Sequence, residues 1–216
     1  MIEFLIALKE TAIMTLIPTI IAIIFGIPIG AILFLTNPKG IKPNKVLYNT
    51  CNILVNVIRS FPFLIFVVCL IPITRLVIGT AFGVYAASFP ICFVAVALYS
   101  RFVEQSFNDI PQGIIDLALS MKLNSYQIVR YFLIVEARQS LVLGLTSCII
   151  SIISYTTVMG IVAAGGIGDY AMQNGYMLLD YAVIYKAVVV IVIIVYSIQF
   201  LGNKIARILD KKRRDV

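Results

Sequence analysis

A run of polar side chains interrupts an otherwise apolar part of the sequence. Asn49, Asn52, Asn56 and Ser60 follow one another at steps of three or four residues, which places them on one face of a helix with Arg59 at its edge. Polar groups within a membrane are costly and usually face a bundle interior or a water-filled cavity. The Asn residues therefore fit either the lining of a translocation route or hydrogen bonds between helices. Arg59 would cost about 2.5–3.5 kcal/mol to insert, so it needs a carboxylate, a carbonyl or water nearby.

A glycine-rich segment, Met159–Gly168, is the second candidate, with the sequence MGIVAAGGIG. A phosphate-binding loop would need a Gly-Lys-Ser/Thr sequence, which does not follow here. Glycine allows the backbone to approach a neighbour closely. The segment is therefore predicted to lie at the helix ends of a gate or to serve as a flexible connector.

The residues that usually catalyse reactions or bind metals are missing or isolated. The chain has no His, and its four Cys residues stand singly within apolar runs, without C-x-x-C spacing. We find no Walker sequence and no pairing of a nucleophile with a base. We therefore expect no catalytic residue, no metal site and no cofactor bound by this chain.

The composition identifies the class of protein. Of the 216 residues, 61% are hydrophobic and 12% are charged, whereas soluble domains average about 45–50% and about 25%. The sequence predicts an all-α polytopic membrane protein with a single domain over 1–216. The net charge of +7 would suggest nucleic-acid binding in a soluble protein, but the distribution of the charges points to the membrane surface instead.

The apolar runs predict five membrane spans, since about 20 apolar residues cross a bilayer. They lie at about 11–36, 46–74, 84–100, 141–164 and 181–203. With this arrangement 13 of the 17 Lys and Arg residues fall on one side, at 39, 42, 45, 101, 122, 130, 138, 204, 207 and 211–214. Positive charges mark the cytoplasmic side, which places the N-terminus outside and the C-terminus inside. Within the first span, Gly26 and Gly30 predict a close contact with another helix.

The longest polar stretch, 101–139, is predicted to be a cytoplasmic pair of short amphipathic helices. Pro111 fits the first turn of one helix, and Asn124 with Gln127 fits a capping box that begins the other. Charged residues alternate here with apolar residues at helical spacing. Such a pair of helices would form a docking element for another protein.

The spans contain few ionisable groups, and no internal repeat is visible. Secondary carriers usually show acidic residues or paired broken helices within the membrane. The chain is therefore expected to supply a route and to obtain energy from a partner. Five spans are few for a closed route, which favours a homodimer with the route on its two-fold axis. A stand-alone channel or secondary carrier for a small solute, with Arg59 as its binding residue, is the alternative.

Over nearly its whole length the chain resembles the membrane permease subunits of bacterial ABC importers, and among them the methionine-type permeases. The residues that carry the resemblance are Gly26–Gly30 with Thr36–Gly40, Asn56–Phe63, Ile71–Thr80, Arg101 and Glu104 before Ile110–Gly113, and Gly165–Gly168. The resemblance implies a homodimer in the cytoplasmic (inner) membrane, with two copies of a cytoplasmic ABC ATPase and an external substrate-binding lipoprotein. ATP and Mg would be used by the ATPase. The implied substrate is D- or L-methionine, with other amino acids and thio-compounds as alternatives.

The resemblance also implies roles for particular residues. Coupling to the ATPase would involve Asp116, Leu117, Ala118, Met121 and Lys122. The gate and pathway would involve Asn52, Asn56, Arg59, Tyr155, Val158, Met159, Gly165 and Gly166, with ordinary packing as the alternative role for Val158 and Met159. Family members usually have a glycine at the position of Lys122 and Leu-Pro at Ile134-Val135. A lysine in the turn must adopt a negative φ or accept strain.

Overall fold

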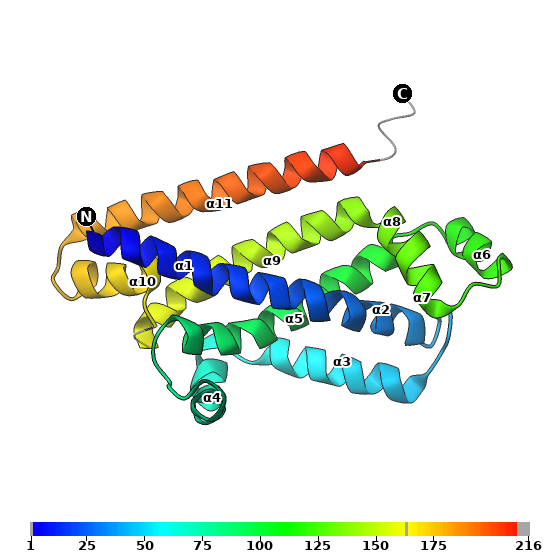
Figure 1. The fold of residues 1–216 in the computed structure, drawn as a ribbon, viewed down its shortest axis with the longest axis horizontal. Coiled ribbons are helices and arrows are strands. Elements are labelled where there is room, and N and C mark those ends of the chain that lie inside the picture. Colours follow the sequence, from blue (N-terminus) through cyan, green and yellow to red (C-terminus); the bar gives the residue numbers. More distant parts are fainter. Residues whose placement is uncertain (1, 163, 211–216) are drawn as a thin grey trace.

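The apolar runs fold as long helices, and the computed structural model describes residues 2–162 and 164–210 (Figure 1). No strand occurs within these ranges. The long helices are α1 (Ile2–Ile21), α2 (Ile27–Thr36), α3 (Lys45–Ser60), α4 (Phe63–Ile78), α5 (Val84–Asn108), α9 (Arg138–Met159) and α11 (Tyr181–Leu209). The shorter helices are α6 (Gln112–Ser120), α7 (Ser125–Gln127), α8 (Ile134–Glu136) and α10 (Gly166–Tyr170).

The first apolar run forms one continuous helical stretch over Ile2–Thr36, with a π-helical turn at Ala22–Gly26 between α1 and α2. The predicted span 11–36 lies inside it. A Cβ atom on Gly30 would lie 2.6 Å from the Ser100 carbonyl oxygen and from the Val103 side chain. The predicted close contact at Gly30 is therefore confirmed, and its partner is α5.

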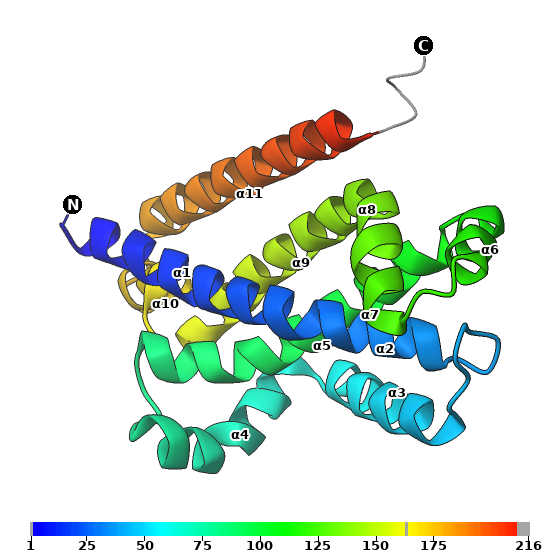
Figure 2. The ribbon, with the colours of Figure 1, turned by 45° about the vertical axis from the view of Figure 1, so that its right-hand side comes forward.

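Helix α5 lies at the centre of the bundle (Figure 2). In its most apolar stretch 61% of the residues are buried, against 6% in α11. One row of buried side chains on α5 recurs every four residues and belongs to the main hydrophobic core, where α5 packs against α1, α2 and α9. The row consists of Ile91, Ala95, Tyr99, Val103 and Phe107. The core of the bundle therefore forms around α5, and α11 lies at the periphery, as expected of a helix that faces lipid.

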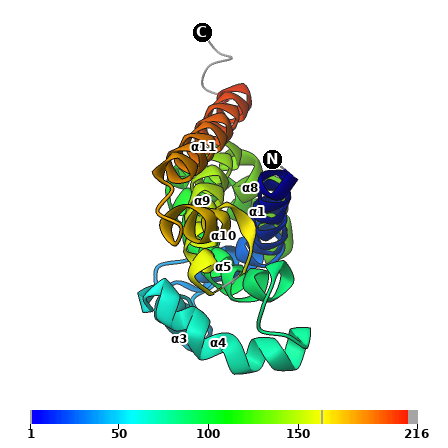
Figure 3. The same ribbon diagram turned by 90° about the vertical axis from the view of Figure 1, so that its left-hand side faces the viewer.

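The second apolar run differs from the single span predicted at 46–74. The chain bends by 110° between α3 and α4. Helix α3 follows the long axis of the molecule (Figure 1), whereas α4 runs across it, on the side of the bundle away from α11 (Figure 3). The bend falls at Phe61 and Pro62. Proline lacks an N–H, and it disfavours a helical conformation in the residue before it, so the helix ends here. Among the described residues, four helical stretches are long and apolar enough to span a membrane, or five if the bent pair counts as one span.

The segment 101–139 lies at one end of the long axis, and the N-terminus and α10 lie at the other end (Figure 1). The predicted capping box is confirmed, because Gln127 N–H donates to Asn124 Oδ1 at 2.9 Å and Asn124 N–H donates to Gln127 Oε1 at 3.0 Å. Pro111 immediately precedes α6 rather than forming its first turn. Between α7 and α8 the chain forms a π-helical turn, Ile128–Leu133.

Candidate functional site

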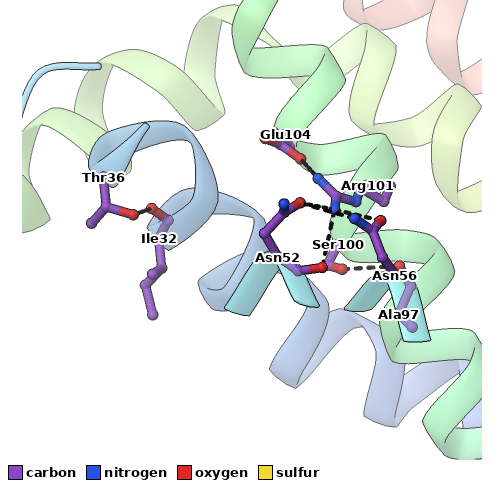
Figure 4. A network of polar contacts seen from close by, with 8 residues as sticks. All are labelled: Ile32, Thr36, Asn52, Asn56, Ala97, Ser100, Arg101 and Glu104. Atoms are coloured by element: carbon purple, nitrogen blue, oxygen red, sulfur yellow. Dashed lines mark hydrogen bonds and ion pairs between the residues drawn. The ribbon is translucent and has the colours of Figure 1, made fainter. Parts of the chain in front are cut away.

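A polar cluster joins α3 to α5 (Figure 4). Arg101, on α5, donates from Nη1 to Glu104 Oε2 at 2.5 Å and from Nη2 to Asn56 Oδ1 at 2.7 Å. Its Nη2 also donates to Asn52 Oδ1. Asn56 Nδ2 in turn donates to Asn52 Oδ1 at 3.2 Å. The polar stripe of α3 is thus anchored by a cation from the central helix.

Burial makes this cluster energetically important. Glu104 is only 7% exposed, and the Arg101–Glu104 pair is the one salt bridge found within the described residues. A buried carboxylate needs such a partner, because removing one member of a buried pair is strongly destabilising. Arg101 Nε is buried and lacks a hydrogen-bond partner. The charged group is therefore held mainly through its two Nη atoms.

The structure brings together only some of the polar residues predicted on α3. Asn52 and Asn56 meet Arg101, and Ser60 Oγ donates to the Asn56 carbonyl oxygen at 2.8 Å. Arg59 lies outside the cluster, on an exposed part of α3. Arg101 was not predicted as a member of the site. The Arg101-x-x-Glu104 spacing was the signal that could have identified it, since residues three apart on a helix can form an ion pair.

The segment predicted to couple to a partner has one buried face and one exposed face. Ala118 and Ile115 are buried, whereas Leu117 and Met121 are each 56% exposed. Asp116 is also exposed and accepts a hydrogen bond from Gln112 Nε2 at 3.0 Å. The buried side chains hold α6 against the bundle, so the exposed apolar side chains are free to contact another molecule.

Lys122 occupies the turn between α6 and α7 with a φ of 54°. This is the left-handed region, which a side chain makes unfavourable by about 1–2 kcal/mol. Of the two options left by the sequence, the structure adopts the strained one. The Lys122 N–H donates to the Leu119 carbonyl oxygen at 3.0 Å, so the tight turn is made despite the lysine.

The predicted gate residues surround the end of α9. The ring of Tyr155 stacks on Phe63 of α4 with centroids 4.4 Å apart. Met159 is 2% exposed and lines a small cavity of about 70 Å³ between α4, α5 and α9. Val158, beside it, is half-buried. These side chains close the space where α4 crosses the bundle.

The two glycines of the predicted gate contact α1. Gly165 and Gly166 have φ values of 83° and 87°, which glycine adopts without steric cost. The Gly166 N–H donates to Glu10 Oε2 at 2.7 Å, and the next residue, Ile167, donates to Thr11 Oγ1 at 2.8 Å. A Cβ on Gly166 would lie 2.7 Å from Met14 Cε. The glycine-rich segment is therefore fixed to the first helix, and Glu10 and Thr11 were missed because they lie far away in the sequence.

Comparisons with known proteins agree with one another. Residues 22–215 match the protein family described as the binding-protein-dependent transport system inner membrane component. The chain is 32% identical over 203 residues to a probable D-methionine transport system permease protein MetI of Vibrio cholerae, covering 94% of this chain and 90% of that protein. It is 37% identical over 151 residues to the D-methionine transport system permease protein MetI of Escherichia coli K12, covering 70% of each.

Solved structures show the same relationship. A chain from inward-facing conformations of the MetNI methionine ABC transporter superposes with a TM-score of 0.94 at 36% identity, covering 97% of both chains. A chain from an amino acid ABC transporter crystallised with histidines superposes with a TM-score of 0.72 at 15% identity. The second likeness concerns the fold alone.

Proposed function

Because the chain belongs to the family of binding-protein-dependent transport system inner membrane components, we propose that it is the permease subunit of an ATP-driven importer for methionine. The observation that carries the proposal is the near-complete superposition on the MetNI permease chain at 36% identity. The protein is a multi-pass inner-membrane permease and not an enzyme. Hydrolysis of ATP is assigned to a separate ATPase.

The exposed apolar face of α4 supports a homodimer. This helix crosses the long axis of the molecule (Figure 3). It carries apolar side chains that are 39% to 86% exposed, namely Leu64, Ile65, Val68, Ile73 and Leu76. A second copy packed against α4 would cover these side chains and would place the polar stripes of two α3 helices around one route. Asn52, Asn56 and Arg59 are assigned to this route.

The α6–α7 segment is proposed to dock on the ATPase at the cytoplasmic face. Leu117 and Met121 would supply apolar contacts, and Asp116 and Lys122 would supply charges at the edge of that contact. Ala118, buried beneath them, would transmit movement of the ATPase to the bundle. The basic residues of the loop before α3 and of the C-terminal part of α11 lie toward the same end of the molecule, which favours the cytoplasm for that end.

The opposite end, with the N-terminus and α10, would then face an external substrate-binding protein. Tyr155, Val158 and Met159 are proposed to form the apolar seal of the route, which opens when ATP binding moves the two permease copies. Apolar constrictions of this kind close a route by excluding water. Gly165 and Gly166 would hold the end of the gate against α1.

Uptake by purified components tests the function. The permease, its co-purified ATPase and the binding protein are reconstituted in liposomes and supplied with radiolabelled methionine. We expect accumulation against a gradient with ATP and none with a non-hydrolysable analogue. Equal uptake without ATP would overturn the proposal and favour a channel or secondary carrier.

A further inference from the structure

Arg101 determines which way the side-chain amides of Asn52 and Asn56 point. A guanidinium group has donors only, so the amide atom that it contacts on each Asn must be the oxygen. The contact measures 2.7 Å at Asn56, and Asn52 contributes the same atom. The Nδ2 groups are therefore turned away from Arg101. One N–H of Asn56 Nδ2 donates a hydrogen bond to Asn52 Oδ1. The other N–H has no acceptor among the described residues.

An open groove lies beside this oriented amide, at the bend between α3 and α4. It has a volume of about 590 Å³ and is lined by Ile53, Asn56, Val57, Ser60, Phe61 and Pro62. The polar lining residues are Asn56 and Ser60, and the others are apolar. The lining therefore matches a small ligand with one polar end and one apolar end.

The polar end of the groove offers one donor and one acceptor. Asn56 presents an N–H. The Ser60 hydroxyl donates its hydrogen bond to the Asn56 carbonyl oxygen at 2.8 Å. The oxygen lone pairs of Ser60 thus remain able to accept a hydrogen bond. An α-amino acid carries the two complementary groups, a carboxylate that accepts and an ammonium group that donates.

The charges near the groove favour the carboxylate. The Arg101 charge is balanced by Glu104 at 2.5 Å. Arg59 is exposed and has no carboxylate within 4.0 Å in the described part of the chain. Helices α3 and α4 contain no acidic residue. A positive charge without a counter-ion attracts an anionic group, most strongly where water is scarce.

We propose that this groove is a binding position on the route for an α-amino acid with an apolar side chain. Asn56 Nδ2 binds the carboxylate, Ser60 Oγ accepts from the ammonium group, and the apolar lining contacts the side chain. Arg59 does not line the groove but directly precedes Ser60 in α3, so its charge favours an anionic group there. The proposal rests on the proposed function, since the groove would be a position at which the transported solute binds during its passage. Arg101 is a positioning residue, because it acts by orienting the amides.

The test uses two probes that differ only at the carboxylate, L-methionine and L-methionine amide. Binding of each to the permease–ATPase complex in lipid nanodiscs, without binding protein, is measured by saturation-transfer NMR. We expect the wild type to bind methionine at least fivefold more tightly than the amide. Asn56→Asp keeps the oxygen that Arg101 contacts and replaces the donor with a negative oxygen, so it should reverse the preference.

Asn49→Asp is the matched control, because Asn49 lies on the same stripe of α3 but does not line the groove. It should keep the wild-type preference. The proposal is overturned if the wild type binds both probes equally or neither, or if Asn56→Asp keeps the wild-type preference. ATP-dependent uptake by the wild type is scored separately. ATP-dependent uptake without a binding preference between the two probes would refute only the groove as a binding position. A binding preference without ATP-dependent uptake would refute only the importer function.

Discussion

Replacing Arg101 by Met should destabilise the protein more than any other single change in the α3–α5 cluster. The variant leaves Glu104 buried without its partner and removes the donor to two Asn oxygens. Breaking a buried ion pair costs about 3–5 kcal/mol. The Arg101 side chain is 18% exposed, which allows some water to reach the remaining carboxylate, so we expect the lower end, about 3 kcal/mol.

Thermal unfolding in detergent measures this loss in a background in which the exposed Cys69 and the half-buried Cys51 and Cys92 are replaced by Ala. A thiol-reactive dye then reports only the exposure of the fully buried Cys148. For a chain of this size 1 kcal/mol corresponds to about 2–4 °C, so Tm should fall by about 6–12 °C. The matched control is the double variant Arg101→Met with Glu104→Gln, which removes both charges and should regain about half of the loss. The reasoning would be refuted if the Tm of the single variant lay within about 3 °C of the wild-type Tm. It would also be refuted if the double variant had a Tm no higher than that of the single variant.

Three further predictions concern the turn, the glycine contact and the docking face. Lys122→Gly should raise the free energy of unfolding by about 1 kcal/mol because it relieves the positive φ, and Lys122→Val should lower it in the same thermal assay; the reverse order would show that the turn is not strained. Gly166→Ala should cost about 2–3 kcal/mol through strain and overlap with α1, whereas Gly113→Ala, with open space around it, should be neutral or stabilising, and equal losses would contradict the contact. Leu117→Asp should reduce the ATPase recovered with the permease at least tenfold while Leu117→Met keeps it, and normal recovery of the ATPase with Leu117→Asp would remove Leu117 from the docking face.

Local features were the part of the fold that the sequence predicted well. The capping box at Asn124 needs only two residues three apart, and the contact at Gly30 needs only the absence of a side chain. Long apolar runs likewise predict helices without knowledge of their neighbours. These features depend on short-range physics, which the order of residues expresses directly.

Features that join distant segments could not be predicted in the same way. Arg101 reaches Asn52 across 49 positions, and Glu10 reaches Gly166 across 156. Arg59 was favoured as the cation of the polar stripe because it is close in sequence, whereas the packing of α3 on α5 selected Arg101. The sequence predicted one continuous span over 46–74, because the 110° bend at Phe61 and Pro62 depends on how both helices pack. The sequence predicts that buried polar side chains need hydrogen-bond or charged partners. The fold determines which residues become those partners.

The bend between α3 and α4 has a consequence for how the protein is made in the cell. Helical hydrogen bonding stops between Ser60 and Phe63, and backbone groups without partners are tolerated at membrane depth only when protein or water surrounds them. If the protein assembles as the homodimer proposed above, a newly inserted single copy would expose this bend and the apolar face of α4 until a second copy packed against it. We therefore expect assembly to follow insertion promptly, and copies made in excess to be substrates for the proteases that clear unassembled membrane subunits.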